Sequence, residues 1–124
     1  MSLLLDTHVL LWWLAGSSRL RLPARAAIAE SPSVYVSAAT AWEIAIKSSL
    51  GKLDFPRSLE QQLLQNQFHP LPISIPHAMA VATLPLHHRD PFGRMLVAQA
   101  RIESLTLVTS DPILRAYDVT TLLV

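Results

Sequence analysis

Hydrophobic positions along this chain form short apolar runs, and helical segments separate these runs. The runs typical of buried strands occupy residues 2–6, 34–36, 105–109 and 119–124. The intervening pattern predicts helices over residues 8–15, 22–30, 37–50, 58–66, 76–83 and 91–103. Strands that alternate with helices and are apolar throughout predict an α/β domain with a mostly parallel sheet, covered on both faces.

Capping residues mark several helix ends. Ser37 is suited to an N-cap, and so is Asp90, which precedes Pro91 at the first helical position. Gly16 and Gly51 suit the C-terminal ends of the helices that precede them. The ends of the first and third helices are therefore expected near these glycines.

Proline restricts three further segments. Pro56, with Ser58, introduces the helix expected over 58–66. The segment 68–73 contains two prolines, so a strand there is expected to be short or at a sheet edge. Asp111 before Pro112 predicts a single helical turn.

Composition adds limits to this outline. The 124 residues fit one domain over residues 1–124, and 51% of them are hydrophobic. The absence of cysteine excludes disulfides and thiolate metal sites. A net charge of +1 means that any RNA contact must rely on local basic patches. Neither a signal peptide nor an apolar run of membrane-spanning length is visible, so we expect a cytoplasmic location without membrane association.

Four acids fall where an α/β sheet usually carries its site. Asp6 and Asp111 each follow a predicted strand, Glu43 lies one to two turns into the helix after residues 34–36, and Asp90 caps another helix. Sites in open α/β sheets form beyond the carboxyl ends of strands. A cluster of carboxylates without thiolates suits Mg²⁺ or Mn²⁺, which can generate hydroxide for attack on a phosphodiester.

Each acid also has a purely structural explanation. Asp6, Asp90 and Asp111 are all suited to capping the helical segments that follow them. Glu43 can pair with Lys47 four residues later. Against this, the apolar neighbours of Glu43 predict a buried helix, in which an idle carboxylate is costly.

Several other side chains are candidates for supporting roles. The hydroxyls of Thr7 and Thr109 lie beside strand-end acids and can bond to a carboxylate or a metal-bound water, or cap the backbone. The candidates for contact with RNA phosphates are Lys47, His88, Arg89 and Arg94. For Arg94, an internal carboxylate is the alternative partner, and for the loop containing His88 a solvated polar surface is the alternative.

Trp12 and Trp13 lie in a helical segment that is apolar on every side. Such a helix must be buried all round. The sheet can cover one face, and a second protomer, a partner protein or the helix over 22–30 can cover the other. The two tryptophans are therefore candidates for a partner surface.

Four enzyme and binding classes are disfavoured. A haloacid-dehalogenase-like phosphatase needs a second acid two residues after the first, and this position is His8. A receiver domain needs paired early acids and an acid after the strand at 34–36, and both are missing. With only three glycines there is no phosphate-binding loop, and the histidines lack zinc-site spacing.

Five segments together resemble one family. They read LLDTHVLLW, SAATAWEIAIK, GKL, HRDPFGRMLVAQA and LVTSD, at residues 4–12, 37–47, 51–53, 88–100 and 107–111. In this order they resemble PIN-domain proteins, specifically the VapC-like toxins of bacterial toxin–antitoxin modules. They span nearly the whole chain, which makes the resemblance specific.

This resemblance implies a three-layer α/β/α fold and an Mg²⁺- or Mn²⁺-dependent endoribonuclease. Such toxins cleave structured RNA such as tRNA or rRNA, form homodimers, are inhibited by a cognate antitoxin and usually bind DNA only through that antitoxin. Asp6, Glu43 and Asp111 match the first, second and fourth acids of the family.

Gly93 departs from the family pattern. Relatives typically carry the third acid there, whereas glycine has no ligand atom and costs a helix roughly 1 kcal/mol relative to alanine. Either Asp90 takes over as ligand, or the nuclease is weakened or inactive, or the change arose because an active toxin is hard to produce. We hypothesise that Gly93 reduces metal affinity and activity; the non-enzymatic alternative is a module that binds RNA or antitoxin without cutting.

Overall fold

A computed structural model describes residues 1–55 and 58–124. The five strands are β1 (Leu3–Leu5), β2 (Val34–Ser37), β3 (His69–Leu71), β4 (Thr106–Thr109) and β5 (Thr121–Leu123). They form one sheet in the order β3-β2-β1-β4-β5, and every neighbouring pair is parallel. The helices are α1 (Thr7–Ala15), α2 (Leu22–Glu30), α3 (Ala38–Ser49), α4 (Leu59–Gln65), α5 (Ile75–Ala80) and α6 (Pro91–Glu103), with 3₁₀ turns η1 (Val81–Thr83) and η2 (Pro112–Ala116).

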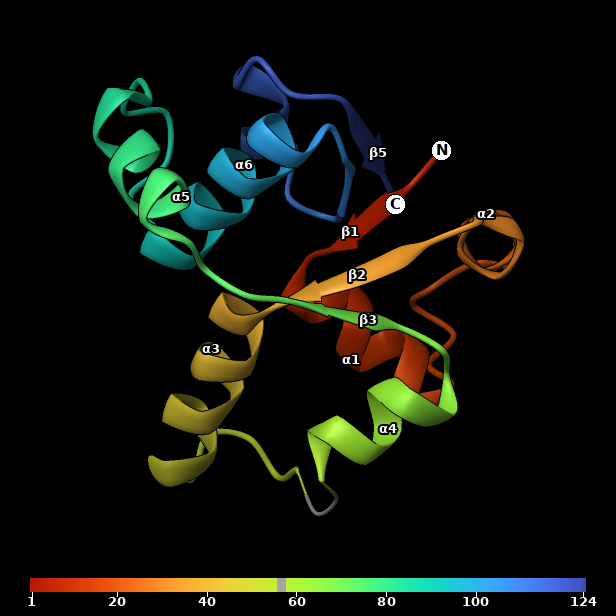
Figure 1. Ribbon diagram of the computed structural model, residues 1–124. Helices are drawn as coiled ribbons and strands as arrows, with labels where there is room; N and C mark the ends of the chain where they lie inside the picture. The colour runs from red at the N-terminus through yellow and green to blue at the C-terminus, as the bar shows by residue number, and fades with distance from the viewer. Residues whose placement is uncertain (56–57) are drawn as a thin grey trace.

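The sheet separates two hydrophobic cores, because successive side chains of a strand point to opposite faces. Leu3 and Leu5 of β1 pack with α1, α2 and α4 on one face. Leu4 between them packs with α6 and Leu107 on the other, where α5 also lies (Figure 1). The predicted three-layer α/β/α arrangement is therefore confirmed.

The third helix bridges the two layers. Ala39 at its start belongs to the α6 core, and Ile44 one turn later belongs to the α1 core. From there α3 extends away from the carboxyl end of the sheet (Figure 1). This places its first two turns beside the ends of β1 and β2.

Most predicted boundaries match the structure. Asp6, Ser37 and Asp90 cap α1, α3 and α6 through their side chains, and Gly16 adopts a left-handed φ of 62° after α1. The segment that carries two prolines forms the three-residue edge strand β3, as expected. The helix expected over 76–83 is instead α5 followed by η1, and the predicted role of Pro56 lies outside the described residues.

A buried polar network joins α5, α6 and β2. Gln99 is fully buried; its amide oxygen accepts from Ser37 Oγ and its amide nitrogen donates to Pro72 O over 3.2 Å. His77 is buried too, and Nε2 lies 2.8 Å from Glu103 Oε2. Because these polar groups have hydrogen-bond partners, the core between the sheet and α6 tolerates polar side chains.

None of the helices in the described ranges is long and apolar enough to cross a membrane.

Candidate functional site

Two acids follow neighbouring strands at the point where the chain order of the sheet reverses. From β1 the chain runs to β2 on one side, and β4 later occupies the other side. Asp6 directly follows β1, and Asp111 lies two residues after β4. This is the topological switch point at which α/β sheets form their sites.

The Asp6 carboxylate is held by two short hydrogen bonds. Oδ1 accepts from the Thr7 backbone N–H, and Oδ2 accepts from Thr109 Oγ1, each over 2.6 Å. Burial raises the pKa of the Asp6 carboxyl above its ordinary value, and the negative charge of Glu43 acts in the same direction. The bonds from Thr109 and Thr7 and the nearby His8 lower the pKa, but burial is the largest effect.

Glu43 approaches the same site from α3. The carboxylate is buried, and Oε1 accepts from Thr7 Oγ1 over 2.8 Å. Thr40, one turn earlier on α3, has its hydroxyl 3.3 Å from that of Thr7. On the outer side Lys47 Nζ lies 2.7 Å from Glu43 Oε2, so the expected i,i+4 pair is present. Glu43 therefore has partners both inside the site and at the surface.

Asp111 and Asp90 are joined through a histidine. His88 Nε2 lies 2.7 Å from Asp111 Oδ2, and His88 Nδ1 accepts from the Asp90 backbone N–H over 3.0 Å. The other oxygen of Asp111 accepts from the Ile113 N–H, which caps η2. Asp90 Oδ1 likewise caps α6 by accepting from the Phe92 N–H. Both predicted caps are confirmed.

Thr109 connects the two sides of the site. Its hydroxyl donates to Asp6 and accepts from the Asp111 N–H over 3.0 Å. One continuous line of hydrogen bonds, made by side chains and backbone N–H groups, thus runs through Glu43, Thr7, Asp6, Thr109, Asp111, His88 and Asp90. Asp90 joins this line through its backbone N–H and not through its carboxylate. The sequence left open whether the Thr7 and Thr109 hydroxyls bond to carboxylates or to the backbone. Each contacts a carboxylate, and that of Thr109 also accepts from the backbone.

Across residues 1–55 and 58–124, no three His, Asp or Glu side chains are arranged so that they could hold a metal ion together. The acids therefore form a connected line and not a closed cage. The side chains nearest to a shared site are Asp6 and Glu43, whose charges act on each other.

Residues 3–119 match the PIN domain family. The chain belongs to this family. It is 29% identical to Ribonuclease VapC22 of Mycobacterium tuberculosis over 119 residues, which cover 94% of this chain and 92% of that protein.

Solved structures with the same fold include two complexes described as bound to DNA. VapBC2 from Rickettsia felis, bound to a promoter fragment, has a TM-score of 0.70 at 12% identity, and the match covers 98% of both chains. FitAB bound to an IR36 DNA fragment has a TM-score of 0.71 at 22% identity, covering 97% of this chain and 93% of that one. At these identities the likeness establishes the PIN fold.

Gly93 of this PIN domain lies against Asp90, one helical turn earlier. A Cβ at Gly93 would stand 3.3 Å from Asp90 Oδ2 and 3.5 Å from Leu114 Cδ2. A side chain at this position would therefore enter space that borders the Asp90 carboxylate.

The candidates for RNA contact differ in their surroundings. Arg94 points inward: its guanidinium donates to the carbonyls of Pro85, Val81 and Leu84 and to the Tyr117 hydroxyl. No carboxylate is among these contacts, so the alternative of an internal carboxylate partner is wrong, whereas contact between Arg94 and RNA phosphate stays a prediction. Lys47 pairs with Glu43, His88 contacts Asp111, and Arg89 is exposed.

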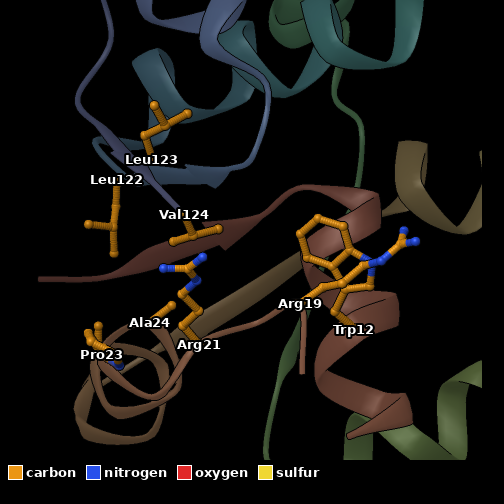
Figure 2. A pocket seen from close by; sticks show the side chains of 9 residues that line it. Trp12, Arg19, Arg21, Pro23, Ala24, Leu122, Leu123 and Val124 are labelled. Atoms are coloured by element: carbon orange, nitrogen blue, oxygen red, sulfur yellow. The ribbon is translucent and has the colours of Figure 1, made fainter. Parts of the chain in front are cut away.

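Trp12 and Trp13 lie in different environments. Trp12 lines an open cavity of about 550 Å³ together with Arg19, Arg21, residues of α2 and the end of β5 (Figure 2). Trp13 packs on Phe68 at 5.7 Å between ring centroids. Its Nε1 donates to Asn66 Oδ1 over 2.9 Å, and Arg25 lies over the ring.

Trp13 is partly buried, as Trp12 is, and lines an open cavity of about 600 Å³ of its own, so a partner surface at the two tryptophans stays a prediction. Adjacent residues of a helix point about 100° apart, and the chain after α4 covers the face that carries Trp13.

Two polar residues of the site were missed by sequence reasoning. Thr40 shares the inner face of α3 with Glu43, a relation that the i,i+3 spacing signals. Tyr117 is buried and accepts from the His88 N–H over 2.9 Å through its hydroxyl. No local pattern marks Tyr117, because its contact spans 29 residues of sequence.

Proposed function

We propose that this PIN domain is a metal-dependent endoribonuclease that acts as the toxin of a toxin–antitoxin pair and cleaves structured RNA such as tRNA or rRNA. The observation that carries the proposal is the line of hydrogen bonds joining Asp6, Glu43, Asp111 and Asp90 at the switch point of the sheet. A purely structural set of caps would not require a partly buried carboxylate with a raised pKa, as Asp6 has.

The donor set fits a hard divalent cation. All the candidate ligand atoms are carboxylate oxygens, which Mg²⁺ and Mn²⁺ prefer. Mg²⁺ usually keeps several waters and takes only one or two protein carboxylates together with substrate phosphates. Asp6 and Glu43 would hold the ion, and Asp111 and Asp90 would supply further oxygens as the site closes on substrate.

A bound cation would supply a nucleophilic water and neutralise the charge that develops on the phosphodiester. The residues of the chain prepare the site for it. Thr109 and Thr7 orient the Asp6 and Glu43 carboxylates, and burial of Asp6 makes its charge costly until a cation arrives. Arg89 is exposed in the loop before α6, which supports a role in contact with RNA phosphate, whereas Lys47 would first have to leave Glu43.

The proposed partners follow from the relatives. We expect a cognate antitoxin, a homodimer in the cytoplasm, and DNA contact only through the antitoxin, because similar folds occur in VapBC2 and FitAB structures bound to DNA. The open cavity beside Trp12 is the candidate place for a partner segment.

Gly93 favours a second candidate, a PIN module that binds RNA or antitoxin with weak or no nuclease activity. A position next to Asp90 that holds no carboxylate leaves the site with one acid fewer than in typical relatives. Metal binding separates the two candidates, because acids without a cation would repel RNA.

The test is cleavage of bulk tRNA by the purified chain in Mg²⁺ or Mn²⁺, beside a Gly93→Asp variant and EDTA controls. Cleavage by the unchanged chain that EDTA stops supports the enzyme. Cleavage by Gly93→Asp alone supports the second candidate, a weakened nuclease of the same family. If neither protein cleaves tRNA at RNA concentrations where binding is measurable, the nuclease proposal is contradicted for these RNAs.

A further inference from the structure

His88 is fixed on all sides by hydrogen bonds, although it lies in a loop. Its backbone N–H donates to the hydroxyl of buried Tyr117 over 2.9 Å, and that hydroxyl also accepts from Arg94 over 3.1 Å. Its ring contacts Asp90 N and Asp111 Oδ2. A histidine that served only to meet RNA phosphate would need an accessible ring nitrogen, and both nitrogens of this ring are already engaged.

The contacts decide which ring nitrogen carries the hydrogen. A backbone N–H can only donate, so Nδ1 accepts from Asp90 and has no hydrogen. In the neutral ring the hydrogen is then on Nε2, which donates to Asp111 Oδ2 at 2.7 Å. The ring thus accepts a hydrogen bond from the backbone N–H of Asp90, the cap of α6, and donates one to Asp111.

We infer that His88 is a positioning residue that holds the Asp111 carboxylate in place for the site. Asp111 Oδ1 is occupied by the cap of η2, so His88 fixes the second oxygen and with it the rotation of the carboxylate. The side chains of His88 and Asp111 are 21% and 32% exposed, so water and a cation can reach Asp111 beside the ring. The sequence suggested His88 as an RNA contact, whereas its bonds direct it to an acid.

This inference rests on the proposed function only where it concerns metal. A carboxylate already oriented by a donor loses less freedom when it binds a cation, and partners of this kind typically change metal affinity by about 10–100-fold.

Two variants test separately the two hydrogen bonds of the His88 ring, one with the Asp90 N–H and one with Asp111. His88→Asn keeps an acceptor near the position of Nδ1 for the Asp90 N–H and removes the donor to Asp111. His88→Gln keeps an amide donor that reaches Asp111 and loses the acceptor. His87→Asn is the matched control, since His87 precedes His88 and its ring packs on Tyr117 and not on an acid.

The first measurement is metal-free ¹⁵N NMR of the imidazole rings. The inference predicts that His88 has hydrogen on Nε2 only, and that Asp111→Asn shifts this Nε2–H signal. Hydrogen on Nδ1, or rapid averaging between the two forms, overturns the inference whether or not the protein binds metal.

The second measurement is Mn²⁺ binding by calorimetry, with melting temperatures recorded for each variant. We expect His88→Asn to fold and to bind Mn²⁺ roughly tenfold more weakly, and His88→Gln to recover most of the loss. Unchanged or tighter binding by His88→Asn contradicts the positioning role. If the unchanged chain binds no Mn²⁺, the proposed function fails, and the NMR result still decides the role of His88.

Discussion

Thr109 Oγ1 donates to Asp6 Oδ2 over 2.6 Å, although the two residues are 103 positions apart in the chain. The bond joins the ends of two neighbouring strands, β1 and β4, at the switch point of the sheet. The same hydroxyl accepts from the Asp111 N–H, so one fully buried side chain sets the position of two candidate ligands.

Replacing Thr109 with valine keeps its shape and removes this bridge. Because the Thr109 bond lowers the pKa of Asp6, Thr109→Val should raise that pKa further. It also leaves two polar partners unsatisfied, which should cost roughly 1–3 kcal/mol of stability. NMR titration of Asp6 and urea unfolding measure the two effects, with Thr109→Ser as the control that keeps the hydroxyl. An unchanged Asp6 pKa in Thr109→Val would contradict the role of the bridge.

The raised pKa of Asp6 predicts a pH-dependent penalty on stability. Burial raises the pKa in the folded state, so the contribution of Asp6 to stability is fully present below its unfolded pKa of about 3.9 and is lost as pH rises through the folded value. Asp6→Asn should therefore melt at a higher temperature than the unchanged chain at pH 7, and the difference should shrink toward pH 4. Asp54→Asn, at an exposed acid, is the control variant measured alongside. A destabilised Asp6→Asn at pH 7 would argue against the burial cost.

A divalent cation should relieve the same penalty. Binding to the folded state raises stability by about 2.7 kcal/mol when the free ion is at 100 times its dissociation constant. Thermal melts with increasing Mn²⁺ should show a rising midpoint for the unchanged chain and little rise for Asp6→Asn. Equal rises in both proteins would place the bound ion elsewhere.

The effect of Gly93 on the helix can be separated from its effect on the site. Gly93→Ala gains helix propensity, worth up to about 1 kcal/mol, but its Cβ meets Asp90 Oδ2 at 3.3 Å. We expect Gly93→Ala to be near neutral and Gly93→Asp to be less stable without metal, because two carboxylates then lie one turn apart. Mn²⁺ should reduce the difference in melting temperature between Gly93→Ala and Gly93→Asp. Melts with and without Mn²⁺ measure this, and a gap that Mn²⁺ leaves unchanged counts against a ligand role at this position.

Gln99 should be required for the stability of the core between the sheet and α6 and not for metal binding. Its side chain is fully buried and bonds to Ser37 and to Pro72 O. Gln99→Leu therefore removes the hydrogen bonds that Gln99 makes to the Ser37 hydroxyl and the Pro72 carbonyl. The expected loss is about 1–3 kcal/mol per stranded group, measured by urea unfolding, with Mn²⁺ affinity unchanged in the folded fraction. A stable Gln99→Leu would mean that the network is dispensable.

Much of the fold could be predicted because its signals are local. Apolar runs marked the strands, capping residues such as Ser37 marked helix starts, and the two prolines after Phe68 placed β3 at an edge. Asp6 and Asp111 were likewise predictable, since each follows a strand whose carboxyl end faces the switch point.

What the sequence could not give were contacts made over long separations. Arg94 turned inward because four acceptors lie within its reach in the folded loop. Trp13, which is partly buried, donates through Nε1 to Asn66, 53 residues away. His88 is hydrogen-bonded to Asp111 because the loop before α6 passes beside η2. None of these partners lies within one turn or one strand of the residue concerned.

The decisive measurement is the initial rate of tRNA cleavage in Mn²⁺, compared between the unchanged chain and Asp6→Asn. We expect the unchanged chain to cleave tRNA and Asp6→Asn to be slower by about 10²-fold or more, since it loses charge stabilisation at the reacting phosphate. Equal rates for the two folded proteins would contradict a nuclease site built around Asp6.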